Sequence, residues 1–246
     1  MKHLIIHVDE HLQREDLIRN EFGNKIDWEF FPAVKYSNLV DLETNQEIEH
    51  KFIRYGVGDS GPRILSPKTI LDKFSGKKYK YIPANNLETI FNPYNTFLSS
   101  PQISLAISHI SAIKYFFENN DVEYFVLCED DIKINSKVDI SNLYGEMLKL
   151  DFDICLLSES PYHKYRRPKQ KEINDYFYEI FPHQYSGAAA YCIRRSCYDI
   201  VKSIDIVSFA ADDMFGILQM DCDCTIIQPY DIPFLLNDLS KNSTLY

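Results

Sequence analysis

The chain has 246 residues, of which 45% are hydrophobic and 8 are glycine, and this ordinary globular composition excludes fibrous and wholly disordered classes. Its length suits one well-buried α/β domain. The formal net charge of −10 argues against a nucleic-acid partner, because nucleic-acid-binding surfaces carry an excess of basic residues.

The six cysteines show no Cys-x-x-Cys spacing, and several lie in apolar runs where a free cysteine behaves as a small hydrophobe. This spacing gives no indication of a zinc site. The chain opens directly into a short strand without a signal-peptide pattern, and no apolar stretch approaches the roughly 20 residues of a membrane span. We therefore expect a soluble, cytoplasmic protein without a transmembrane segment.

The first elements predict the opening of a parallel β-α-β unit. Apolar strands are expected at His3–Val8 and Trp28–Val34, with a helical stripe between them at Gln13–Phe22. A ligand-binding loop would follow the first strand. Its candidate contacts are His7, Asp9 and Arg14.

Residues 39–98 show little periodicity, so we interpret them as an inserted segment, either a cover over the site or surface decoration. A long helix is then expected from its N-cap at Ser100, with Asn119 to Asp121 at its end. Its apolar stripe comprises Ala106, Ile107, Ile110, Ile113 and Phe117. His109 lies beside this stripe and is either a hydrogen-bonded packing residue or a catalytic group with a tunable pKa.

The central motif is an apolar run, Tyr124–Cys128, that ends in the carboxylates Glu129, Asp130 and Asp131. The run predicts a buried strand, which places the acids at its carboxyl end, where open α/β sheets collect ligands. Adjacent carboxylates repel each other unless a cation lies between them, and a hard divalent cation prefers such oxygen ligands. The alternative is a solvated acidic turn.

Three later segments contain further candidates. After a second predicted buried strand at Phe152–Ser158, the basic run Tyr162–Lys171 includes Arg166 and Arg167, which would clamp a diphosphate or belong to a solvated face. The small residues that follow Gly187 allow close backbone approach to a ligand or a packed helix. Asp212 and Asp213 form a second acidic pair, which is either functional or an N-terminal helix cap.

In this order the motifs resemble glycosyltransferase family 25, the lipooligosaccharide and collagen galactosyltransferase relatives, over most of the chain. Cys128–Ile132 is similar to the family signature Leu-Glu-Asp-Asp-Val, while His7 and Glu10 stand where the family has Asn and Arg. The segments that carry the resemblance are His7–Glu10 with Arg14, Phe31–Val34, Ser108–His109, Cys128–Ile132, Phe152–Cys155, Gly187–Arg195 and Ala210–Asp213.

The resemblance implies a GT-A-like (Rossmann-like) fold, in which a mostly parallel sheet is flanked by helices. It also implies a UDP-sugar donor that carries galactose or glucose, a glycan or protein hydroxyl as acceptor, and Mn²⁺ or Mg²⁺ as the cation. A metal held by Glu129 and Asp131 would neutralise charge on the departing diphosphate. Because the family inverts the anomeric carbon, one carboxylate must deprotonate the acceptor. Asp213 is the first choice for this base and Asp212 the second.

His109 is a further catalytic candidate. The residues expected to contact the nucleotide sugar are His7, Asp9, Arg14, Asp130, Arg166, Arg167 and Gly187. Two other hypotheses remain: a relative that binds a sugar or nucleotide without turnover, and a different metal-dependent enzyme, such as a phosphohydrolase, that uses the same acids.

Overall fold

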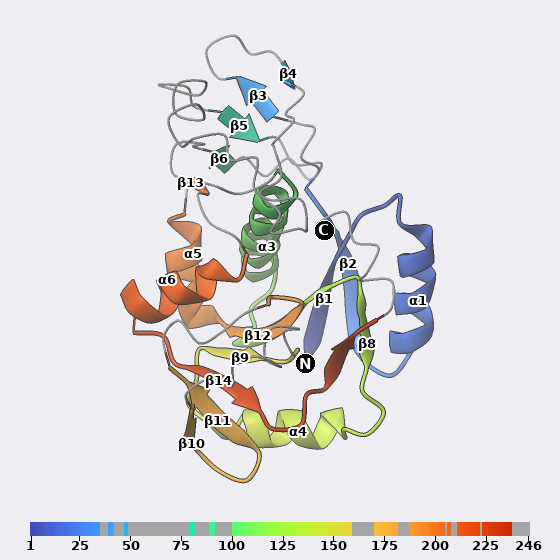
Figure 1. The fold of residues 1–246 in the computed structure, drawn as a ribbon, viewed down its shortest axis with the longest axis vertical. Helices are drawn as coiled ribbons and strands as arrows, with labels where there is room; N and C mark the ends of the chain where they lie inside the picture. Colours follow the sequence, from blue (N-terminus) through green and yellow to red (C-terminus); the bar gives the residue numbers. More distant parts are fainter. Residues whose placement is uncertain are drawn as a thin grey trace, which may run out of the picture.

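The structure is a computed structural model that describes residues 1–34, 39–41, 47–48, 79–81, 89–91, 100–158, 170–181, 187–204, 206–207, 211–221 and 223–237. Within these ranges the backbone alone is described for residues 39–41, 47–48, 79–81, 89–91, 100–103, 170, 206–207, 213, 217 and 220–221. Figure 1 shows the arrangement, with helices α1 (Leu12–Phe22) and α3 (Ser100–Asn119) on opposite sides of strands β1 (Lys2–His7) and β2 (Asp27–Pro32).

The predicted β-α-β unit at the N-terminus is confirmed. β1 and β2 pair in parallel, with His3 opposite Trp28, and α1 connects them. The five residues after Lys2 are all buried, because alternate side chains of β1 enter the two cores on either side of the sheet. Gly23, at φ +42°, ends α1 by donating its amide to the carbonyl of Arg19.

The main sheet has eight strands in the order β10-β11-β14-β9-β12-β7-β1-β2. The strands not yet given are β7 (Tyr124–Glu129), β9 (Ile154–Leu156), β10 (Gln170–Glu172), β11 (Phe177–Ile180), β12 (Ala190–Arg194) and β14 (Ile226–Pro229).

The expectation of a mostly parallel sheet needs correction, because the sheet is mixed. β2, β1 and β7 are parallel neighbours, as are β9 and β14, but β12 runs antiparallel to both β7 and β9. The chain enters β12 beside the carboxyl end of β7, with Ala190 opposite Cys128 and Arg194 opposite Tyr124. It therefore has to run back toward the amino end of β7.

Helices cover both faces of this sheet. On one face, the stripe predicted for α3 enters a core with α5 (Tyr198–Lys202) and α6 (Asp213–Asp221), which confirms the helical pattern. On the other face, α1 and α4 (Ile140–Met147) share a second core with alternate residues of β1 and β7. The sheet is thus buried on both sides, which explains the unbroken apolar run of β7.

Two smaller sheets complete the fold. One pairs β8 (Ile132–Ile134) with β15 (Phe234–Leu236) directly after the acidic motif. The other has the order β13-β6-β5-β3-β4, and its strands are β3 (Leu39–Asp41), β4 (Glu47–Ile48), β5 (Tyr79–Tyr81), β6 (Thr89–Phe91) and β13 (Ile206–Val207). Most of residues 39–98 lie outside the described part, so the expected cover stays a prediction.

Candidate active site

The acidic motif and the first loop meet at one edge of the main sheet. β1 and β7 are parallel neighbours, with Ile6 opposite Glu129, so both strands end at this edge. β1 ends at His7, and the chain turns at Asp130 and Asp131 immediately after β7. The sequence prediction that these side chains share the carboxyl edge therefore agrees with the strand pairing.

Asp130 is bound by two cationic or proton-bearing groups from the first β-α unit. His7 Nδ1 donates to Asp130 Oδ2 at 2.8 Å, and Arg14 Nη1 donates to Oδ1 at 2.6 Å. Burial raises the pKa of Asp130, but the His7 hydrogen bond and the charge of Arg14 outweigh it, so the pKa lies below its ordinary value. Asp130 is thus a buried, ionised carboxylate, and each of its two oxygens accepts a hydrogen bond from a side chain of the protein.

Glu129 lies beside a second histidine. His109 is fully buried on α3, and its Nε2 is 3.5 Å from Glu129 Oε1. Its Nδ1 is 2.9 Å from the hydroxyl of Tyr191, whose pKa burial raises well above its ordinary value. A hydroxyl that stays protonated can donate to Nδ1, which leaves the hydrogen on Nε2. At 3.5 Å from Glu129 this Nε2 makes no hydrogen bond with any residue that the structure describes.

Asp131 differs from its neighbours in the surroundings of one carboxylate oxygen. Its Oδ1 is buried and accepts no hydrogen bond from any residue that the structure describes, and only 6% of the residue is exposed. Burial and then the negative charge of Glu129 raise the pKa of Asp131 to about 7. The main chain at this position is fixed separately, because the amide of Asn237 donates to the carbonyl of Asp131 at 2.9 Å.

These contacts suit Glu129 and Asp131, rather than Asp130, as ligands of a divalent cation. An unpartnered buried carboxylate oxygen beside a second negative charge is an unfavourable arrangement that a hard cation would relieve. The negative charge of Asp130 is already balanced by the guanidinium of Arg14, and His7 hydrogen-bonds its other oxygen, so Asp130 needs no metal ion to offset its burial. The three carboxylates therefore divide into two groups with different surroundings.

The second acidic pair lies at the start of α6. Asp212 Oδ2 accepts a hydrogen bond from the amide of Gly187 at 3.3 Å, which links this pair to the loop before β12. Gly187 has φ +85°, a conformation that favours glycine. Asp213 is the first residue of α6, and its side chain lies outside the described part.

The remaining predicted contacts are placed less fully. Asp9 is exposed in the turn between β1 and α1. Arg166 and Arg167 lie outside the described residues, as does most of the basic run. The structure thus brings together His7, Arg14 and Asp130, and separately Glu129 and His109.

Sequence reasoning did not single out Tyr191 or Asn237. Tyr191 occupies the tyrosine position of the Gly187–Arg195 motif, so a signal for it was present. Asn237 lies more than a hundred residues beyond the acidic turn, and no local pattern marks it. Its contact arises because β15 pairs with β8, the strand that follows the turn.

The comparison with protein families identifies the class of protein to which this chain belongs. Residues 1–214 match the model described as glycosyltransferase family 25 (LPS biosynthesis protein). The chain therefore belongs to glycosyltransferase family 25, and the resemblance found in its motifs is confirmed.

Two other comparisons add little. A solved structure titled "Crystal Structure of A197 from STIV" is similar to this chain at 10% sequence identity and a TM-score of 0.42, covering 97% of this chain and 95% of that one. No curated protein matches the sequence.

Among the helices that the structure describes, none is long and apolar enough to cross a membrane.

Proposed function

We propose that the protein is a metal-dependent, inverting glycosyltransferase with a GT-A-like fold that moves a hexose, galactose or glucose, from a UDP-sugar to a hydroxyl of a glycan or protein. Family membership supports transfer of a sugar. The observation that carries the metal dependence is the buried Oδ1 of Asp131, which lies beside Glu129 where two strands end and accepts no hydrogen bond within the described part of the chain. The proposal treats the chain as one domain with residues 39–98 inserted.

In this proposal Glu129 and Asp131 hold Mn²⁺ or Mg²⁺. The bound cation supplies a Lewis acid that neutralises charge on the leaving diphosphate. His109 is fully buried, so we assign it a positioning role in which its Nε2 orients Glu129. We propose that residues nearer the surface contact the acceptor directly.

The first β-α unit contributes to donor binding. His7 and Arg14 hold Asp130 ionised and fix the turn in which Asp131 lies. Asp9, Arg166, Arg167 and Gly187 are proposed to contact the nucleotide sugar, the arginines through charge-assisted hydrogen bonds to phosphate.

The acceptor hydroxyl must lose its proton as it attacks the anomeric carbon. We propose Asp213 as the base and Asp212 as the second choice. Asp212 already accepts from the Gly187 amide, so it is better suited to hold the loop before β12. Asp213 begins a helix, where the positive end of the helix dipole keeps a carboxylate ionised.

The metal role is tested by Asp131→Asn, with Asp16→Asn on the exposed surface of α1 as the matched control. We expect Asp131→Asn to lower sugar transfer at least about 100-fold, because metal stabilisation of a leaving group contributes several kcal/mol. Thermal unfolding with UDP, GDP or CMP, each with and without Mn²⁺, should show a Mn²⁺-dependent shift with UDP that the variant loses.

The apo stability of Asp131→Asn gives a second readout. Replacing a buried, repelled carboxylate should not lower the melting temperature of the metal-free protein, so loss of transfer would not reflect unfolding. Normal transfer in Asp131→Asn would refute the metal role. Release of phosphate without sugar transfer by the wild type would instead indicate a phosphohydrolase.

A further inference from the structure

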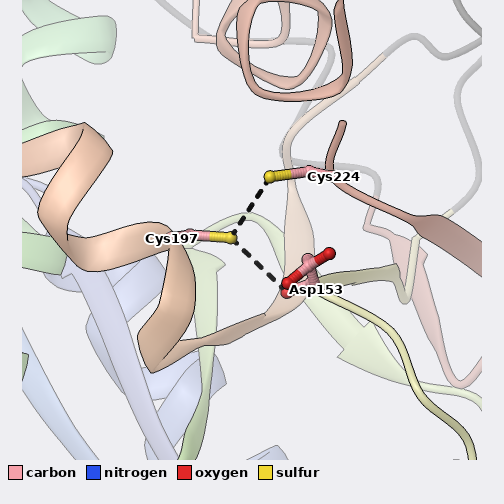
Figure 2. A group of neighbouring side chains, drawn as sticks. All are labelled: Asp153, Cys197 and Cys224. Atoms are coloured by element: carbon pink, nitrogen blue, oxygen red, sulfur yellow. Dashed lines mark hydrogen bonds between the residues drawn. The ribbon is translucent and has the colours of Figure 1, made fainter. Parts of the chain in front are cut away.

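A second set of metal-binding side chains lies away from the acidic edge. Asp153 immediately precedes β9, Cys197 is the last residue of the short 3-10 helix η3 (Arg195–Cys197), and Cys224 lies two residues before β14. Figure 2 shows their side chains gathered at one point. Among the residues that the structure describes, this is the only group of three or more acidic, cysteine or histidine side chains with clustered ligand atoms.

The distances suit a tetrahedral metal ion. The two sulfur atoms are 4.0 Å apart, and no two ligand atoms of the group are more than 4.8 Å apart. Around a zinc ion with Zn–S bonds of about 2.3 Å, two tetrahedral sulfur ligands lie about 3.8 Å apart. The thiols therefore already stand at the required separation, and the carboxylate would have to approach by no more than about 1 Å.

The carboxylate is held in place by neighbours that are not ligands. Ser196 Oγ donates to Asp153 Oδ1 at 2.7 Å, and the amide of Thr225 donates to Oδ2 at 2.9 Å. Each carboxylate oxygen can accept a second interaction, so these bonds orient Asp153 without exhausting it. Such partners are what metal-ligating carboxylates usually have.

The thiols have few competing interactions. Cys197 Sγ donates to the carbonyl of Asp153 at 3.8 Å, lies 4.0 Å from Cys224 Sγ and also interacts with the side chain of Ser196. Both residues are buried: Cys197 is fully buried, and 7% of Cys224 is exposed. Sulfur hydrogen bonds are weak, so replacing them with metal bonds loses little.

We propose that Cys197, Cys224 and Asp153 form a site for a thiophilic divalent cation of the zinc type, with two thiolates and one carboxylate as protein ligands and a water molecule as the fourth. The alternative hypothesis is a disulfide bond between Cys197 and Cys224. It requires the sulfurs to close from 4.0 Å to about 2.05 Å, a movement of about 2 Å that metal binding does not need. This site is separate from the acidic edge and does not depend on the proposed transfer.

The site would join three segments that are distant in sequence. It links the start of β9, the end of η3 and the chain that leads into β14. The intervening segment contains α5, β13 and α6 and therefore the Asp212–Asp213 pair. We expect a bound cation to stabilise this segment, because a ligand that binds only the native state shifts the folding equilibrium.

Cobalt(II) is the probe for the first experiment, because it takes the same geometry and reports thiolate ligands through a near-ultraviolet charge-transfer band. The protein is reduced, freed of metal with a chelator and titrated. We expect one equivalent of Co²⁺ with that band, displacement by Zn²⁺, and protection of two thiols from alkylation. In Cys224→Ser and Cys197→Ser the band should fall to half or less, and affinity should drop at least about tenfold.

The matched control is Cys155→Ala, which removes a buried cysteine in β9 that lies outside the group. It should bind Co²⁺ as the wild type does. Ser196→Ala, which removes an orienting hydrogen bond but no ligand, should weaken binding about tenfold while keeping the band. Zn²⁺ should also raise the melting temperature of the wild type and not that of Cys224→Ser.

Two results would overturn the proposal. One is Co²⁺ binding without a thiolate band, or with the same band and affinity in Cys224→Ser. The other is a reduced wild-type protein that binds no Co²⁺ and that, on exposure to air, forms a Cys197–Cys224 disulfide visible by peptide mass spectrometry. In that case the pair is a redox couple.

Discussion

Asp130 illustrates how one buried carboxylate depends on its partners. Its side chain is 5% exposed, that of Arg14 13%, and their ion pair spans 2.6 Å. A buried charge is costly unless it is paired, so removing one partner costs more than the attraction alone. We expect Arg14→Met to lower the free energy of unfolding by about 3 kcal/mol, because the buried Asp130 carboxylate then keeps the His7 hydrogen bond but loses the charge of Arg14. Urea unfolding measures this change.

Arg19 on the same helix provides the control. It also pairs with a carboxylate, Glu15, at 2.7 Å, but its side chain is 56% exposed. Exposed pairs of this spacing are worth about 0.3–0.5 kcal/mol, and the cation-π contacts of Arg19 with the rings of Trp28 and Phe30 add about 0.5–1 kcal/mol. Arg19→Met should therefore cost no more than about 1.5 kcal/mol. Equal losses in the two variants would contradict the special role of burial at Arg14.

At this scale the sequence predicted that the acids follow a strand, but not which side chains contact them. An apolar run that ends in Glu129 places the acids at a strand end by local pattern alone. That His7 bonds Asp130 rather than Glu129 depends on β1 and β7 being neighbours and on successive side chains of β7 facing opposite sides. The Cys197–Cys224 contact was also not predicted. It joins segments that are distant in sequence, and no Cys-x-x-Cys spacing marks it.

At the scale of elements, α3 is fastened to the end of β2 through serine side chains. Ser108 Oγ accepts from the amide of Val34 at 2.8 Å and donates to the carbonyl of Ser104, whose own hydroxyl donates to the carbonyl of Val34. The serine of the Ser-His motif thus satisfies buried main-chain groups, and it positions the helix that holds His109.

Ser108→Ala should therefore destabilise the protein. The Val34 amide would be left buried without an acceptor, which costs about 2 kcal/mol. Ser111 on the same helix is equally buried, but none of the residues placed by the structure hydrogen-bonds its hydroxyl. Ser111→Ala should cost no more than about 0.5 kcal/mol or even stabilise the protein. Thermal and urea unfolding of both variants provide the comparison, and a larger loss for Ser111→Ala would refute it.

Elements with a strong repeating pattern were predicted well. The stripe of α3 and the β1-α1-β2 unit follow from the spacing of apolar residues, which local sequence determines. The direction of β12 was not predictable, because a strand buried on both faces reads the same whether it pairs in parallel or antiparallel. The mixed character of the sheet arises from the order in which the chain visits its positions.

For the whole molecule, stability at acid pH should depend on His3. Its Nδ1 donates to the carbonyl of Asp27 at 3.1 Å, and its Nε2 lies 2.8 Å from the hydroxyl of Tyr144, so the neutral ring connects β1 with β2 and α4. Burial lowers the pKa of His3 from 6.5 to about 4. The folded protein therefore takes up this proton only at lower pH than the unfolded chain does.

The sign of the pH effect follows from this difference. As pH falls from about 6.5 to about 4, the unfolded chain binds a proton that the folded protein does not, so the free energy of unfolding decreases by about 3 kcal/mol. His3→Asn lacks the titrating group. Its free energy of unfolding should therefore fall by about 3 kcal/mol less than that of the wild type between about pH 6.5 and about pH 4. Parallel pH profiles of the two proteins, measured by urea unfolding, would show that His3 does not titrate as proposed.

The position of β14 has a consequence for synthesis. β14 lies between β11 and β9 in the main sheet, yet it follows every other strand of that sheet in the sequence, and the Asn237 contact to the acidic turn comes later still. On a growing chain β9 and β11 therefore wait with unpaired edges that can pair with other chains. Translation that stops before residue 226 leaves a protein that is open to aggregation at the centre of its sheet.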